Sequence, residues 1–181
     1  MRAVLAILFS ALVCISAARQ QRSPVESPST PEMTRLVHAL AGEWKTVETM
    51  QKSLEFPNGG SRHGSVSVRL LAGGTTLFYG VHSDGSAGKL DGFHLIWWDK
   101  KQGTYLFFAC FNNPVNPCHP RGTAHWENDN LVNDYEESAG GKSSQWKDTL
   151  LFSPGKHTLI AAMRGADGQF KTQITTVATR H

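Results

Sequence analysis

Histidine has the widest chemical use of any residue type in this chain, and the sequence holds eight of them. Imidazole is the commonest metal ligand and also ligates haem iron. No two histidines are two residues apart in a predicted strand or four apart in the predicted helix, the spacings that place neighbouring ligands on one face. His94 alone lies in the middle of a predicted strand, where it shares a face with Ile96 and Trp98. It is either an axial haem ligand or a hydrogen-bonded core histidine, and we favour the core histidine.

Familiar catalytic motifs are absent from the sequence, which contains no G-x-S-x-G, H-E-x-x-H, phosphate-binding loop or G-x-G-x-x-G. Asp148 shares its strand face with Trp146, and an inward Asp148 would need a partner such as Arg164. Alternatively, the protein is an enzyme whose barrel holds the substrate, with Tyr79, His94 or Asp148 as general acid or base. The sequence names no catalytic residue, and we lean against an enzyme.

Two cysteines in the second half of the chain, Cys110 and Cys118, bracket a loop that contains two prolines. An even pair of cysteines in an oxidising compartment favours a disulfide. The alternative is a metal site that adds His119 and His125. Paired zinc ligands are usually two to four residues apart, and Cys110 and Cys118 are farther apart than that.

Aromatic side chains recur on one alternating phase of the predicted strands, the phase that we assign to the interior. Aromatic residues inside a barrel more often fill its core than line a pocket. The candidate pocket residues are Tyr79, His94, Trp98, Phe107, Trp126, Tyr135 and Trp146.

The first residues, 1–18, have the features of a secretory signal peptide: Arg2, a short apolar run and small residues ending at Ala18. We expect cleavage near Ala18 and a secreted or periplasmic protein without a membrane span. A lipid anchor on Cys14 is an alternative. Val13 does not favour it, because a lipoprotein signal has a small residue before the cysteine. Residues 19–30 are polar and contain two prolines, so they predict a flexible leader.

The remaining residues, 31–181, predict one domain with a short helix and many strands. Thr30 is a helix N-cap, Pro31 opens the helix and Gly42 ends it. Turn signals separate the segments that follow, which makes successive strands antiparallel. A sheet of about ten strands removes its edges by closing, so we expect an all-β, up-and-down antiparallel barrel. The predicted strands are 44–50, 63–71, 75–82, 92–99, 104–111, 122–127, 130–136, 144–152, 157–164 and 169–179.

Charge and composition limit the classes of molecule that the protein is expected to bind. The formal net charge is only +3, and the basic residues are scattered, which argues against nucleic acid. Segments 92–99 and 104–111 are apolar on both faces, so either the helix or a partner subunit must cover their outer side. A homo-oligomeric interaction module is therefore one alternative function.

Short cues spread over 31–180 resemble lipocalin-like, calycin-type barrels, in particular small secreted bacterial domains of unknown function. The cues are Leu-Ala-Gly42-Glu-Trp44 after a helical turn, Gly73-Gly74, Trp98-Asp99 before a turn, and Asp167-Gly168 before the last strand. The resemblance implies that an arginine near the chain's end, Arg180 or alternatively Arg164, packs over Trp44 and closes the barrel floor. Trp44 and Arg180 are therefore expected to be structural.

Architecture and the absence of a catalytic pattern together predict an exported barrel that binds a small apolar or amphipathic molecule and needs no cofactor. The alternatives are a haem or zinc protein centred on His94, or on His119 and His125, and the interaction module.

Overall fold

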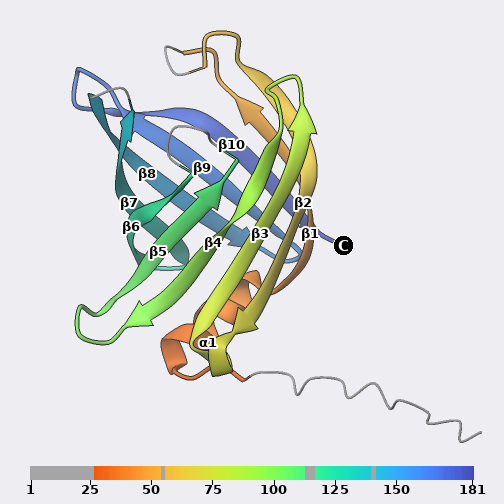
Figure 1. Cartoon of the computed structure of the whole chain (residues 1–181), viewed down its shortest axis with the longest axis vertical. Helices are drawn as coiled ribbons and strands as arrows, with labels where there is room; N and C mark the ends of the chain where they lie inside the picture. Colours follow the sequence, from red (N-terminus) through yellow and green to blue (C-terminus); the bar gives the residue numbers. More distant parts are fainter. Residues whose placement is uncertain (1–26, 54–55, 113–116, 140–141) are drawn as a thin grey trace, which may run out of the picture.

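The computed structural model describes residues 27–53, 56–112, 117–139 and 142–181, and the structural statements below concern these residues. The expected signal peptide and most of the expected leader lie outside them, so both stay predictions. Ten strands, one α-helix and one short 3-10 helix follow one another (Figure 1). Their bounds are α1 Pro31–Leu40, β1 Gly42–Met50, β2 Gly60–Leu71, η1 Ala72–Gly74, β3 Thr76–Gly85, β4 Leu90–Asp99, β5 Thr104–Phe111, β6 Cys118–Glu127, β7 Asn130–Ala139, β8 Lys142–Ser153, β9 Lys156–Arg164 and β10 Phe170–Arg180.

The ten strands form one closed barrel in which each strand pairs with its neighbours in the chain and β1 pairs with β10. All of these pairs are antiparallel, and the closing pair sets Trp44 opposite Arg180 and Val47 opposite Val177. Closure leaves no strand edge unpaired. The predicted all-β, up-and-down antiparallel barrel is confirmed.

The start of strand β6 is the strand boundary that lies farthest from its prediction, because β6 begins at Cys118 and not at residue 122. Pro120 and Gly122 give this stretch the composition of a turn. In the structure Pro120 pairs with Phe108, and the register of β5 and β6 shifts between Leu106 and Phe108. A bulge of this kind accommodates a proline inside a ladder. The early start of β6 adds His119 and Arg121 to the barrel wall.

Helix α1 lies across one end of the barrel (Figure 1), which we call the helix end. Thr30 caps it through a hydrogen bond from the Met33 N–H to its side-chain oxygen, 3.2 Å long. Met33, Leu36 and Leu40 are buried in the main core. No helix in the described ranges is long and apolar enough to cross a membrane.

The helix does not cover the outer face of β4 and β5, which was one of the two covers expected from the sequence. Its apolar side packs into the barrel end because Met33, Leu36 and Leu40 share one stripe of the helix. The outward side chains of β4 and β5 stay partly exposed; they are Phe93, Leu95, Trp97, Leu106 and Phe108.

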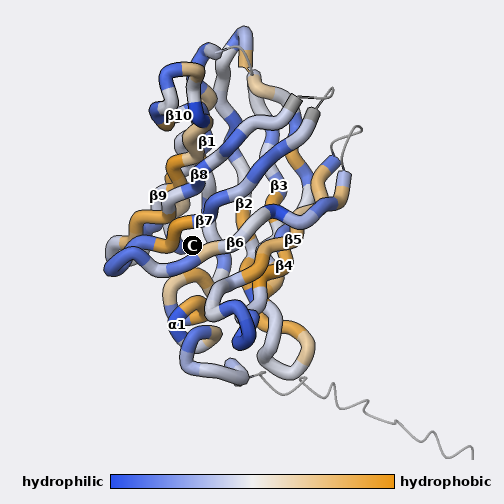
Figure 2. The backbone as a smooth tube through the Cα atoms, turned by 90° about the vertical axis from the view of Figure 1, so that its left-hand side faces the viewer, coloured by the Kyte–Doolittle hydropathy of each residue, from blue (hydrophilic) through white to orange (hydrophobic). Residues whose placement is uncertain are grey.

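The barrel interior has two halves of different chemistry. The half next to α1, the helix half, is filled by an apolar cluster that includes Trp44, Leu77 and Leu131. The other half, the far half, carries polar and charged inward side chains together with a smaller cluster around Tyr135 and Trp146. Figure 2 shows hydrophobic segments on α1 and on strands β4, β5 and β9, with hydrophilic segments at both ends of the barrel. A candidate site therefore lies in the far half.

Candidate functional site

Two inward histidines face the interior on either side of a small residue. The register pairs His94 of β4 with Ala109 of β5, and Ala109 with His119 of β6. Ala109 is 0 % exposed and occupies little volume between the two imidazoles. Nδ1 of His94 and both ring nitrogens of His119 are buried and have no hydrogen-bond partner among the described residues.

The environment of His94 keeps its ring neutral. Burial lowers its pKa from the ordinary 6.5 to about 3, and the positive charge of Arg121 and the neighbouring His119 act in the same direction. A neutral imidazole offers one hydrogen-bond donor and one acceptor. His94 is thus equipped to form neutral hydrogen bonds in the interior.

Arg121 is the main cation of the far half. Its Nη2 donates to the Tyr135 hydroxyl oxygen at 2.6 Å, and its guanidinium lies 4.2 Å from the centre of the Tyr135 ring. Nη1 is 4.0 Å from the Glu137 carboxylate, and the Arg121 side chain is 17 % exposed. Nε of Arg121 is buried without a partner in the described part of the chain. One edge of the guanidinium is therefore available to an acceptor.

A polar relay continues from Arg121 across β7 to β8. The Tyr135 hydroxyl donates to Oδ1 of Asp148 at 3.3 Å. Burial raises the pKa of Asp148 to about 6, against the opposing effect of Arg121. Burial, followed by the charge of Asp148, also raises the pKa of Tyr135, so the phenol stays protonated. Arg121, and not the expected Arg164, is the cation that faces Asp148.

Arg164 has other partners. Its Nη1 donates to the Gln145 side-chain oxygen at 2.8 Å and its Nε donates to the Gly168 carbonyl at 3.1 Å, both at the surface. The sequence indicated that an inward Asp148 would need a cation. It did not identify Arg121, because Pro120 and Gly122 made this segment resemble a turn.

The opposite wall of the far half carries a compensated ion pair. Nε of Arg62 donates to the Glu48 carboxylate at 2.7 Å, and the Thr176 hydroxyl donates to its other oxygen at 3.3 Å. Both charged side chains are largely buried. Burial, followed by the charge of Glu48, raises the pKa of Tyr79 on this side. This wall offers little uncompensated charge.

The seven aromatic and histidine candidates do not converge on one point. His94 contacts the rings of Tyr79 at 5.9 Å and Phe107 at 6.3 Å between centroids, at mid-height in the barrel. Tyr135 and Trp146 stack at 6.2 Å in the far half, beside Arg121. These five residues thus form two groups of inward side chains, one around His94 and one beside Arg121.

Trp98 and Trp126 lie instead at the helix end. Trp98 contacts the Tyr105 ring at 4.9 Å, and Nε1 of Trp126 donates to the Tyr105 hydroxyl oxygen at 3.1 Å. That hydroxyl donates to the Glu32 carbonyl of α1 at 2.7 Å. The two tryptophans therefore pack where the helix meets the barrel, away from His119 and Arg121.

Trp44 and Arg180 meet at the helix end as well. The Arg180 guanidinium lies 4.7 Å from the centre of a Trp44 ring, and Nε1 of Trp44 donates to the Leu40 carbonyl at 2.8 Å. The indole ring also contacts His157 at 4.4 Å. This geometry joins the first strand, the last strand and the helix.

Cys110 and Cys118 are opposite each other on β5 and β6, with their sulfur atoms at disulfide-bonding distance. The expected pairing of the two cysteines is confirmed. The bridge anchors the beginning of β6 to β5, directly before His119. It thereby fixes the strand segment that carries His119 and Arg121.

The two histidines of the metal alternative lie on different faces of β6. His119 faces the interior opposite Ala109, whereas His125 is exposed and lies 3.1 Å from the Glu127 carboxylate. Among the described residues, no group of three or more histidine, cysteine or acidic side chains is arranged to hold a metal ion. The haem and metal alternatives stay predictions.

Comparison with known proteins adds no family to this picture. No protein-family model matches the chain, and no curated protein sequence matches it.

Proposed function

We propose that this protein binds a small amphipathic molecule in the far half of the barrel interior, without catalysing a reaction. The observation that carries the proposal is a set of buried polar atoms without a partner in the described part of the chain: Nδ1 of His94, both ring nitrogens of His119 and Nε of Arg121. Buried polar groups in proteins are nearly all hydrogen-bonded, and each unpaired group costs ~1–3 kcal/mol. A bound ligand that pairs with them recovers part of this cost.

The apolar part of the ligand has aromatic surface beside these atoms. Phe107 and Tyr79 flank His94, and the stacked pair of Tyr135 and Trp146 flanks Arg121. Pockets for small molecules combine mostly apolar walls with a few polar groups that fix orientation. The far half has both ingredients, which supports an amphipathic ligand over a purely apolar one.

The charges around Arg121 favour an uncharged polar group on the ligand. Arg121 already faces Asp148 through Tyr135 and faces Glu137 directly. A carboxylate or phosphate beside Arg121 would also approach these two acidic groups, and like charges in a partly buried site repel strongly. A carbonyl or hydroxyl oxygen avoids this repulsion and still accepts from Nε of Arg121.

Export is part of the proposal. The apolar run and small residues of 1–18 support a signal peptide, and a cysteine pair at bonding distance fits an oxidising compartment. The ligand would then be met outside the cytoplasm.

The experiment is a fluorescence titration with Prodan, an uncharged naphthalene probe with one ketone acceptor and emission that reports hydrogen bonding to that ketone. We expect a Kd of about micromolar, equivalent to ~8 kcal/mol. Arg121→Met removes a hydrogen bond from a charged donor, so we expect binding to weaken about tenfold or more. Arg164→Met is the matched control, because it removes a surface arginine, and binding should be unchanged.

A second variant separates the loss of a ligand contact from misfolding caused by an unpaired Asp148. Arg121→Met leaves Asp148 without its cation, whereas the double variant Arg121→Met/Asp148→Asn leaves the interior without either charge. Circular dichroism checks the fold of both variants. Failure of Prodan to bind the parent, or equal affinity in the parent and the folded double variant, would overturn the proposal.

A further inference from the structure

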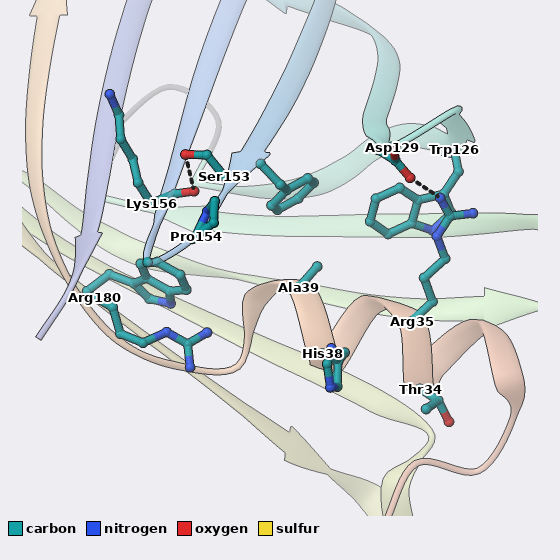
Figure 3. Close-up of a pocket in the computed structure, with 13 residues that line it drawn as sticks. Thr34, Arg35, His38, Ala39, Trp126, Asp129, Ser153, Pro154, Lys156 and Arg180 are labelled. Carbon is teal, nitrogen blue, oxygen red and sulfur yellow. Dashed lines mark hydrogen bonds and ion pairs between the residues drawn. The ribbon is translucent and has the colours of Figure 1, made fainter.

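A groove of about 820 Å³ lies at the helix end, between α1 and the barrel strands. One side is α1, with Arg35 and His38, and the other is the turn between β8 and β9, ending at Lys156, together with Arg180 at the end of β10. Figure 3 shows Arg180 and Lys156 on one side, Arg35 on the other, and His38 on the helix between them. This groove is separate from the polar far half of the interior.

Positive charge dominates the groove. Its lining contains Arg35, Lys156 and Arg180, against a single carboxylate, that of Asp129. Asp129 lies 3.7 Å from Arg35 and compensates it in part. Within the described residues, neither Arg180 nor Lys156 has a carboxylate within ion-pair distance. About two positive charges thus remain without a counter-charge in the groove.

Both arginines are held in place by the walls. The Arg35 guanidinium lies 4.1 Å from the centre of a Trp126 ring, and its Nη2 donates to the Asn128 carbonyl at 2.5 Å. The Arg180 guanidinium lies 4.7 Å from the centre of a Trp44 ring. Stacking on an indole face restricts each guanidinium and leaves its N–H edges for other acceptors. Less side-chain entropy is therefore lost when an anion binds.

We propose that this groove binds a phosphate group, carried either by a small organic molecule or by a lipid headgroup. A phosphate monoester bears nearly two negative charges at neutral pH and has three acceptor oxygens, which suits the Arg180 guanidinium and the positive potential that Lys156 adds to the groove. The proposal concerns a second site, independent of the ligand in the barrel interior.

The test is calorimetric titration with phenyl phosphate at low ionic strength, with phenol as the uncharged comparison. We expect binding of phenyl phosphate with a Kd below about a millimolar, weakened several-fold by ~0.5 M salt because the screening length shrinks. Arg180→Gln should weaken binding at least fivefold, and Lys156→Gln should weaken it at least twofold. Arg69→Gln is the matched control, since Arg69 also stacks on an aromatic ring, Phe78, at 5.2 Å, but lies outside the groove.

Vesicles distinguish the two sources of phosphate. Co-sedimentation with vesicles containing phosphatidic acid, but not with phosphatidylcholine alone, assigns the site to a lipid headgroup. Binding of phenyl phosphate without vesicle binding assigns it to a small molecule. Lys156 is exposed, so Lys156→Gln should fold even if Arg180→Gln is destabilised. The proposal is overturned if the parent binds phenyl phosphate no better than phenol, or if every folded variant of these two binds it as well as the parent.

Discussion

Burial sets the protonation of two inward histidines, His94 and His157. His94, at mid-height, has a pKa lowered to about 3, and His157, beside Trp44, has a pKa lowered to about 4 by burial and then by Arg180. Both rings are neutral at pH 7. An unfolded histidine takes up a proton near pH 6.5, whereas these folded ones resist it. They contribute stability that is fully present above about pH 6.5 and is lost as the pH falls toward their folded pKa values.

Replacing His94 should reduce the loss of unfolding free energy as the pH falls. In His94→Gln, the free energy of unfolding should fall less between pH 7.5 and pH 5 than in the parent, by about 2 kcal/mol, the equivalent of 1.5 pKa units. Asp148, with its pKa raised to about 6, acts in the opposite direction but is common to both proteins. Urea unfolding at both pH values measures the difference. Exposed Val47→Ala removes no titratable group and should follow the parent, and parallel profiles for His94→Gln and the parent would contradict the effect.

The sequence predicted part of the candidate site. Two-residue alternation was sufficient to place Tyr79, His94 and Phe107 on one inward phase, because these strands are regular. It gave Arg121 no role, because the predicted strand began at residue 122 and left Arg121 in a segment that Pro120 and Gly122 make resemble a turn. The local sequence pattern therefore could not identify Arg121, which contacts Tyr135 and Glu137 in the polar half.

At the scale of elements, the prediction of strands succeeded because turn residues separate them so clearly. Glycines with positive φ, such as Gly103 and Gly155, mark turns that few other residues adopt. What the sequence could not show is where α1 docks. Its apolar stripe fits either the outer face of β4 and β5 or the barrel end, and only tertiary packing decides between them.

Helix α1 and strand β1 are joined through Trp44, which is 3 % exposed. Trp44→Ala removes the hydrogen bond to Leu40 together with the contacts to His157 and Arg180, so it should reduce the free energy of unfolding by ~3–5 kcal/mol. Val47→Ala, on the same strand but 47 % exposed, should change it by under ~0.5 kcal/mol. Chemical denaturation measures both. A loss below about 1 kcal/mol for Trp44→Ala would show that this residue does not close the floor.

At the scale of the whole molecule, the barrel divides into a filled half that provides stability and a polar half that carries the candidate site. The two small residues Ala109 and Ala124 illustrate the division. Both are 0 % exposed, but Ala124 belongs to the apolar core cluster whereas Ala109 separates His94 and His119. A large side chain at position 124 would overpack the core, whereas one at 109 extends into the proposed ligand site.

The most direct test of interior binding is therefore a Prodan titration of Ala109→Trp beside the parent. Ala162→Trp, on the outward face of β9, is the matched control for added aromatic surface. We expect the parent and Ala162→Trp to bind Prodan with similar affinity, about micromolar, while folded Ala109→Trp loses binding by at least tenfold. Equal binding by Ala109→Trp and the parent would place the probe outside the barrel and contradict an interior ligand site.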